Sequence, residues 1–330
     1  MEFLLSREDL DVVELAREAI GAHVPLSRVR ESEEWRGWVA LGSAGWLHAC
    51  LSGEVSMPVL SAIAREAGRV AGSGQFVSNA WTIPKLLSSA ADEDAGAAWL
   101  DHHGSRPGAL LHAGMGERSV LAGLGPGYDL YLVQASGAAP TLHRCDHGTV
   151  LSSPVAGLSL GAARLDELPA PDATLPLALT SEQAQAITRG ARVLAAGAAA
   201  GLADELVART VSHVTSREQF GQPLGRFQAV KHLLADAHAG AEVAWLSVLF
   251  AAADGDDAAA DHAELLSRRA LTFAAQTSSQ LQGAMGFTWE SDLHLLLKAG
   301  LDIRATTQDP TVVAQRSGLA TMATVPTMGE

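Results

Sequence analysis

The sequence is poor in aromatic residues and in cysteine, and both shortages restrict the fold. Aromatic residues make up 5% of the 330 positions, whereas hydrophobic residues as a whole make up 48%. The apolar content is mainly alanine, leucine and valine, which favours packed helices over sheets. The two cysteines, Cys50 and Cys145, cannot build a disulfide framework and belong to no CxxC pair. We therefore expect a mainly helical protein with free thiols, in a reducing cytoplasm.

Basic residues and long apolar runs are also scarce, which argues against two classes of partner. The chain carries 23 basic and 37 acidic residues, a formal net charge of -14. This charge would repel a phosphate backbone, so we expect no nucleic-acid partner. We find no stretch near the roughly 20 continuous apolar residues that cross a bilayer, and the first residues carry acids where a signal peptide is positive. We therefore expect neither membrane insertion nor secretion.

The first third of the chain has the periodicity of helices. Ser6 followed by Asp9 resembles a capping box, which would start the first helix. Further helical patterns cover 33–41, 57–71, 76–89 and 92–102. We therefore interpret residues 1–104 as an N-terminal helical domain.

After residue 104 the sequence shows strand patterns first and helical patterns again from about residue 179. Short runs between Gly and Pro turn signals predict strands at Ser119–Ala122, 130–134, 149–152 and 157–160, so 105–178 is interpreted as a small β domain. Thr180 with Gln183 makes a second capping box, and helical periodicity then continues, which predicts a helical bundle over 179–330. One helix of this bundle has an apolar face that we expect in the core, at Phe227, Val230, Leu234, Ala237, Ala241, Ala244, Trp245 and Val248.

The segment 216–228, between two predicted long helices, carries an unusual chemical combination. It reads SREQFGQPLGRFQ, and its glycines and proline fit a tight turn. Arg217, Gln219 and Phe220 offer a bidentate anion donor, an amide and an aromatic face close together in the chain. An ordinary polar connection accounts for any one of these residues but poorly for the combination. The set suits a planar ligand that bears phosphate.

A second segment, 280–290, reads QLQGAMGFTWE. Its small residues let backbone N–H groups approach a cofactor closely. Both segments resemble signatures of the acyl-CoA dehydrogenase family, R-x-Q-F-G-x-x-L-x-x-F-Q and Q-x-x-G-G-x-G-F, with Ala284 where the second glycine is usual. The stretches 41–47 (LGSAGWL) and 63–69 (IAREAGR) also resemble this family, so the resemblance spans most of the chain.

This resemblance implies a fold, a cofactor and a set of partners. The fold is mainly α with a small β domain: an N-terminal helical domain, a middle β-barrel-like domain and a C-terminal four-helix bundle. The substrate is an acyl-CoA, the cofactor is FAD, and an electron-transfer flavoprotein or similar acceptor takes the electrons. In the family the first signature reaches the FAD of a neighbouring subunit. The implied FAD contacts here are Arg217, Gln219, Phe220, Phe227, Gln228, Gln280, Gly283 and Ala284.

The resemblance fails at the catalytic base. Acyl-CoA dehydrogenases remove the α proton of a thioester with a carboxylate while the β hydride passes to flavin. Ungapped alignment puts the two base positions of the family at about Thr307 and Ala191, and neither is acidic. Asp309 is the better nearby substitute and Glu182 the weaker one, although both read equally well as acids at helix starts.

The β region departs from the family as well. It contains no tryptophan between 107 and 180, where the family has a Trp-x-Ser/Thr element near the flavin ring, and it lacks the T-E-P-x-A-G-S segment. The chain thus resembles the smaller subunit, without catalytic base, of actinobacterial heterotetrameric (α2β2) acyl-CoA dehydrogenases, for which sterol-derived acyl-CoAs are frequent substrates. We therefore predict FAD-dependent α,β-dehydrogenation of an acyl-CoA, shared with a related subunit that supplies the Glu.

Two alternatives remain open. The first is a homo-oligomeric acyl-CoA dehydrogenase that uses an unaligned acid such as Asp309. The second is a non-redox protein of the same fold that binds a ligand or stabilises a partner. A metal centre is not expected: His143, Cys145 and His147 alternate as on one face of a strand, but a fourth ligand is not evident and a short polar turn explains the same residues.

Overall fold

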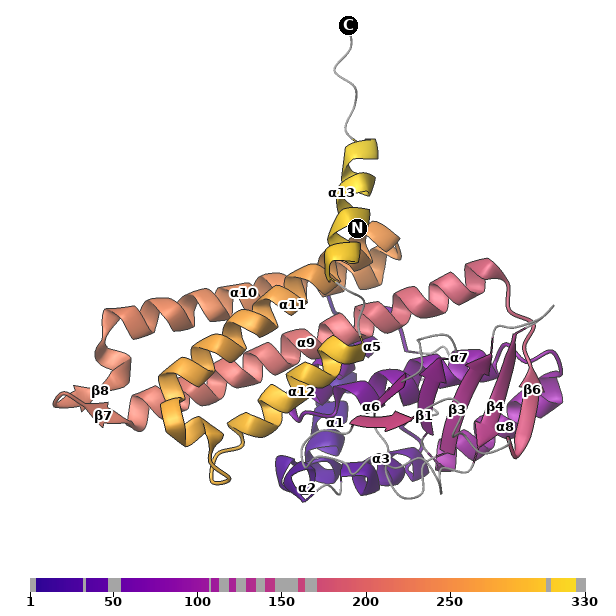
Figure 1. The fold of residues 1–330 in the computed structure, drawn as a ribbon, viewed down its shortest axis with the longest axis horizontal. Coiled ribbons are helices and arrows are strands. Elements are labelled where there is room, and N and C mark those ends of the chain that lie inside the picture. Colours follow the sequence, from indigo (N-terminus) through magenta and orange to yellow (C-terminus); the bar gives the residue numbers. More distant parts are fainter. Residues whose placement is uncertain are drawn as a thin grey trace, which may run out of the picture.

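The structure of the protein is a computed structural model. It describes residues 4–31, 34–46, 55–106, 108–112, 119–122, 129–134, 140–145, 160–163, 171–306 and 310–324. Helices come first, a small sheet region follows, and long helices complete the chain (Figure 1). The predicted fold class, mainly α with a small β part, is confirmed.

The first helices are short, and their ends are set by local signals. They are α1 (Arg7–His23), α2 (Leu26–Arg30), α3 (Glu34–Ser43), α5 (Met57–Arg69), α6 (Ser73–Val77), the π-helical η1 (Ser78–Thr82), α7 (Ile83–Leu87) and α8 (Glu93–Ser105). The capping box at Ser6 is confirmed, because its side chain accepts from the amide of Asp9 and Asp9 returns the bond. The predicted helix over 76–89 is helical, but a π turn interrupts it at η1.

The described strands between 108 and 176 form one four-stranded sheet and one pair. The sheet has the order β1 (Gly108–His112), β3 (Asp129–Gln134), β4 (Thr141–Cys145), β6 (Ala173–Pro176), with β1 and β3 parallel and the other neighbours antiparallel. The pair is β2 (Ser119–Ala122) with β5 (Leu160–Ala163). The predicted strands at Ser119–Ala122 and 130–134 are confirmed. The one at 149–152 lies outside the described residues, as do 157–159.

The main apolar core runs through the N-terminal helices and the long C-terminal helices. A smaller apolar cluster joins the sheet to the N-terminal helices. Tyr131, Leu142 and Leu175 share a cluster with Ile83 and Leu87 of α7. At the same junction Asn79 of η1 accepts a hydrogen bond from the amide of Gly108, 2.6 Å away, and the backbone carbonyl of Asn79 lies 3.1 Å from Nε2 of His103. His103 is fully buried, and burial lowers its pKa to about 4, because the charged imidazolium would lose its hydration.

The C-terminal part is built from long helices around α9 (Ser181–Ser216). After α9 come the hairpin strands β7 (Glu218–Gln219) and β8 (Gln222–Pro223), the 3₁₀ turn η3 (Leu224–Arg226), α10 (Gln228–Asp254), α11 (Asp257–Gln282), the 3₁₀ turn η4 (Gly283–Phe287), α12 (Leu293–Thr306) and α13 (Pro310–Thr324). The capping box of Thr180 and Gln183 is confirmed at the start of α9.

Glycines allow α5 and α9 to touch backbone to backbone. A Cβ atom on Gly201 of α9 would lie 1.9 Å from the carbonyl oxygen of Arg65, and one on Gly68 of α5 would lie 2.0 Å from that of Ala198. No side chain fits at either position without moving a helix. This seam packs the N-terminal helices directly onto the bundle.

Helix α10 is apolar enough, by length and composition, to cross a membrane, although 39% of its most apolar window is buried. Its predicted core face is confirmed from Val230 to Val248, with Leu234, Ala237, Ala241, Ala244 and Trp245 also buried. Phe227, the remaining member of that face, caps the helix and is half-buried. The hydropathy of α10 therefore reflects in part its role as a core helix of the bundle.

Candidate flavin-binding segments

The first predicted cofactor segment forms a tight hairpin that projects from the end of α9. Phe220 and Gly221 both have positive φ, 54° and 78°, and the amide of Leu224 closes the turn on the carbonyl oxygen of Arg217 at 2.9 Å. The ring of Phe220 is 90% exposed and meets Phe227 edge to face, with centroids 6.2 Å apart. Arg217 and Gln219 are also exposed. The hairpin therefore presents its polar and aromatic groups outward.

The second predicted segment lies where α11 ends. Gly283 has φ 57° and ψ −143°, a region that is essentially restricted to glycine, so the requirement here is conformational rather than spatial. The side-chain amide of Gln282 donates to Oγ1 of Thr210 at 3.1 Å, which ties the end of α11 to the last turns of α9. Gln280 and Ala284 are exposed.

The structure brings the two segments to the same end of the bundle. Gln228 is exposed at the start of α10, directly after the hairpin. Figure 1 shows the β7–β8 hairpin at one end of the long axis and the four-stranded sheet towards the other. The implied FAD contacts therefore lie towards the end of the bundle that is remote from the sheet of their own chain.

Exposed side chains after α11 were missed by the sequence analysis. Met285, Phe287 and Trp289 are all exposed at this end of the bundle. The ring of Trp289 meets that of His294 at 4.9 Å, and Nζ of Lys298 lies 5.6 Å from the Trp289 centroid. The sequence could have indicated these exposed side chains, because the segment 280–290 combines several large apolar residues with glycines.

Buried charges occupy the opposite half of α9. Arg192 donates from Nε to Glu264 at 2.8 Å and also binds Asp261, while Nε of Arg316 on α13 donates to Asp261 at 2.8 Å. Burial alone would raise the pKa of Asp261, but the hydrogen bonds from Arg316 and Arg192 outweigh it and hold that pKa below its usual value. Asp261 is therefore an ionised structural partner rather than a proton acceptor.

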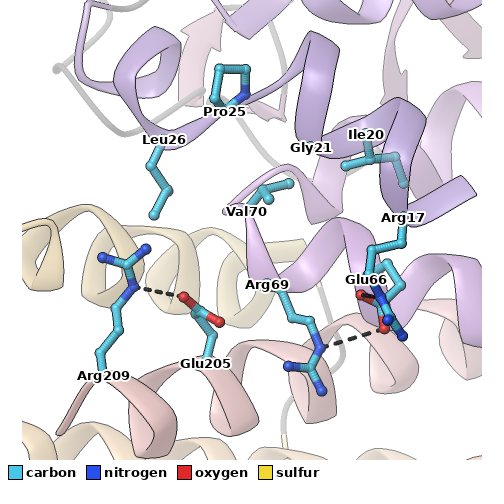
Figure 2. A pocket seen from close by; sticks show the side chains of 10 residues that line it. All are labelled: Arg17, Ile20, Gly21, Pro25, Leu26, Glu66, Arg69, Val70, Glu205 and Arg209. Carbon is cyan, nitrogen blue, oxygen red and sulfur yellow. Dashed lines mark hydrogen bonds and ion pairs between the residues drawn. The ribbon is translucent and has the colours of Figure 1, made fainter. Parts of the chain in front are cut away.

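A cleft of about 540 Å³ lies between α1–α2, α5 and α9 (Figure 2). None of the predicted site residues lines it. Nε of Arg17 donates to Glu66 at 2.9 Å, and Nε of Arg209 donates to Glu205 at 2.7 Å. Arg69 also faces Glu66, at 3.5 Å. Because each arginine of the lining has a carboxylate partner, the charges of the cleft largely compensate one another.

Two groups of possible metal ligands have other partners. Asp204, His238 and Glu242 lie close enough to share an ion, but Arg65 donates to Asp204 at 2.8 Å and to Glu242 at 3.1 Å, so a cation already bridges these carboxylates.

On β4, His143 contacts Oγ1 of Thr174 at 2.8 Å and Oε1 of Gln134 at 3.1 Å. Cys145 is a buried free thiol, and burial raises its pKa. His147 lies outside the described residues.

Comparison with known proteins identifies the family. The profile of the acyl-CoA dehydrogenase C-terminal domain matches residues 182–306, which span α9 to α12. The acyl-CoA dehydrogenase IpdE2 of Mycobacterium tuberculosis is 30% identical over 257 residues, which cover 72% of this chain and 81% of the relative. The chain belongs to the acyl-CoA dehydrogenase family.

Solved structures share the fold of this acyl-CoA dehydrogenase chain. The ChsE4-ChsE5 complex of Mycobacterium tuberculosis matches with a TM-score of 0.76 at 19% identity, covering 99% of this chain and 100% of the other. The Tcur3481-Tcur3483 steroid ACAD matches with a TM-score of 0.71 at 23% identity, covering 96% and 98%. The resemblance inferred from the two sequence segments is confirmed at the level of family and fold.

Of the two base positions expected from the sequence, at about Ala191 and Thr307, the structure describes only Ala191. Ala191 is half-buried within α9, and Glu182 is exposed in its first turn. Thr307 and Asp309 lie outside the described residues. Asp257, near the start of α11, pairs with Arg189 at 3.4 Å.

Proposed function

We propose that this chain is a subunit of an FAD-dependent acyl-CoA dehydrogenase in which a related partner chain completes the flavin site and supplies the catalytic Glu. One observation carries the proposal. At the end of the bundle that is remote from the sheet of the same chain, six of the eight signature residues are exposed and two, Phe227 and Gly283, are half-buried. Groups placed there are available to a neighbouring subunit and are remote from their own β domain.

The residues at this end fit the parts of FAD. The exposed Arg217 guanidinium suits the pyrophosphate, because its planar donors match phosphate oxygens in pairs. Gln219 and Gln280 add amide donors, and the exposed ring of Phe220 offers a surface for a planar heterocycle. The positive φ of Gly283 turns the backbone after α11 so that amides can face a ligand. FAD, when bound, supplies the hydride acceptor for α,β-dehydrogenation.

The proposed need for a partner base has independent support. A carboxylate must accept the α proton of the thioester. In the described part of the first half of α9 and the start of α11, the buried acids Asp261 and Glu264 are held by Arg192. A carboxylate held by a buried arginine is a poor base, because the pair stabilises its ionised form.

The named relatives suggest which partner and substrate to test. Two of the similar structures are described as two-component assemblies, ChsE4-ChsE5 and Tcur3481-Tcur3483, and the second is described as a steroid enzyme. We therefore propose a hetero-oligomer with a related acyl-CoA dehydrogenase chain, a sterol-derived or other bulky acyl-CoA as substrate, and an electron-transfer flavoprotein or similar protein as acceptor.

The deciding experiment measures bound flavin. The chain is purified alone and after co-expression with the related chain encoded beside it, and the flavin spectrum and native mass are recorded. We expect flavin only in the mixed oligomer, with one FAD per pair of chains. Flavin in an oligomer of this chain alone, with turnover abolished by Asp309→Asn, would instead support the homo-oligomeric enzyme. Absence of flavin from both preparations would support a non-redox protein.

A matched pair of variants tests the cofactor segment within the mixed oligomer. Arg217 and Arg226 are both exposed arginines of the same interhelical connection. Arg217→Ala should weaken flavin binding by ~10-fold to ~100-fold, the usual range for a lost charge-assisted hydrogen bond. Arg226→Ala should leave it unchanged. Equal flavin affinity in the two variants would refute the assignment of Arg217.

A further inference from the structure

The second cofactor segment, 280–290, is fixed at its first end by the long helices. The side-chain amide of Gln282 donates to Oγ1 of Thr210 at 3.1 Å, and the hydroxyl oxygens of Thr210 and Ser278 lie 2.8 Å apart. Thr210 and Ser278 are both buried. Because these bonds lie in the interior, the start of the segment is held in place relative to α9.

The second end of the segment is held by Asp292, directly before α12. Its Oδ1 binds Arg30 of α2, and its Oδ2 accepts a hydrogen bond from Nη1 of Arg209 on α9 at 3.2 Å. Nε of Arg209 also donates to Glu205, 2.7 Å away. The backbone carbonyl of Asp292 accepts from the amide of Leu295 at 3.0 Å, so the same residue starts α12. Asp292 therefore joins α2, α9 and α12.

The residues that follow Asp292 pack against the segment itself. Gly286 is buried, and a Cβ atom on it would lie 2.5 Å from Cδ2 of Leu293, which is buried as well. The ring of Trp289 meets that of His294 at 4.9 Å. In a closely packed contact, a shift of one side is passed to the other. Movement of Asp292 would therefore move Leu293 and His294, and with them two parts of the cofactor segment.

Arg30 reaches this point from the N-terminal helices, 262 residues away in the sequence. Figure 2 shows Arg209 pointing from α9 towards Leu26 of α2, the helix that carries Arg30. The side chains of Arg30 and Asp292 are 39% and 22% exposed, and a pair of this kind contributes little to global stability. Two arginines that bind different oxygens from different helices do, however, fix the orientation of one carboxylate.

We propose that Arg30 is a positioning residue for the cofactor segment. By holding Asp292, it sets the conformation in which residues 283–289 meet the flavin. This inference rests on the proposed function, because the flavin is the ligand that the segment would contact. The N-terminal helices then contribute to flavin affinity without touching the flavin.

The test compares two arginines of the same short helix. Arg28 is half-buried like Arg30, but its Nη1 donates to the backbone carbonyl of His23 at 3.1 Å and so remains within the N-terminal helices. Amide hydrogen exchange of residues 283–291 and the flavin dissociation constant are measured on the mixed oligomer. Arg30→Gln should accelerate exchange in this segment and raise the dissociation constant about threefold to tenfold. Arg28→Gln should change neither.

Rescue and coupling separate positioning from a general loss of packing. Arg30→Lys keeps the positive charge and should recover most of the flavin affinity. Asp292→Asn should by itself accelerate exchange and weaken flavin binding, which keeps the test available if Arg30→Gln does not fold. In the Asp292→Asn background, Arg30→Gln should have no further effect on flavin binding, because the two residues act through one contact. Fully additive effects would overturn the role of Asp292.

The remaining outcomes also decide the question. Unchanged exchange of the segment in Arg30→Gln, or the same change in Arg28→Gln, overturns the inference. Equal flavin affinity of wild type and Arg30→Gln overturns the positioning role even where exchange is faster. A wild-type mixed oligomer without flavin would instead refute the proposed function, so the two failures are distinguishable.

Discussion

Replacing Gly201 by alanine should destabilise the protein, although alanine is the better helix former. In a helix interior the substitution alone is worth about 1 kcal/mol in favour of alanine. The new Cβ, however, would lie 1.9 Å from the carbonyl oxygen of Arg65 and 2.7 Å from its carbonyl carbon. Because this neighbour is backbone, α5 and α9 would have to separate by about 1 Å along a closely packed seam.

The expected net result follows from the two opposing effects. Overpacking of this kind costs about 1–3 kcal/mol and sometimes more, and the seam joins the N-terminal helices to the bundle. We expect Gly201→Ala to lower the free energy of unfolding by ~2 kcal/mol, measured by urea titration. Gly240→Ala in α10 is the control, because a Cβ added there would meet no atom within 4 Å, and it should be neutral or stabilising by up to ~1 kcal/mol. Stability of Gly201→Ala equal to or above wild type would refute the close approach of α5 and α9.

Three further perturbations have defined outcomes. Arg192→Met leaves Glu264 buried without a cation, whereas Asp261 keeps Arg316, so urea titration should show a loss of ~3 kcal/mol; a loss below ~1 kcal/mol would contradict the buried network. Burial lowers the pKa of His103 from 6.5 to about 4, so between these pH values the unfolded chain binds a proton that the folded chain does not. The stability linked to His103 is therefore complete above about pH 6.5 and falls by ~3 kcal/mol as the pH drops to 4. His103→Gln should flatten this pH dependence of the free energy of unfolding. Phe220→Ala should change the free energy of unfolding by under ~0.5 kcal/mol, because the ring is exposed. The same variant should raise the flavin dissociation constant of the mixed oligomer up to ~10-fold. A variant that unfolds more readily would mean that Phe220 is a packing residue.

The parts of the fold that could be predicted depend on residues close together in the chain. The capping boxes at Ser6 and Thr180 each involve a residue three positions later, and both are present. The core face of α10 follows from helical periodicity alone, and the burial of Val230 to Val248 agrees with it. A pattern within one turn or one helix carries its own geometry, so the sequence suffices to find it.

One prediction was incomplete because a local pattern competes with tertiary contacts. The helix predicted over 76–89 has the expected periodicity, yet it contains the π turn of η1. There the buried Asn79 bonds the carbonyl of Gln75 and the amide of Gly108. Trp81 donates to the carbonyl of Ile187 on α9 at 2.9 Å. Partners so distant in sequence leave no trace in the local spacing of apolar residues.

The sequence by itself determined the family, the order of helices and sheet, and the two segments that carry the cofactor signatures, because these are properties of short motifs and of periodicity. Tertiary structure decided where those motifs point. Helix α9 runs the length of the bundle (Figure 1), so its two ends lie in different environments. The end near Arg217 is exposed, whereas Arg192, in the other half, is buried and bound by acids of α11. Only the packing of α5, α10 and α11 around α9 sets this division, because it fixes which residues of distant segments share an environment.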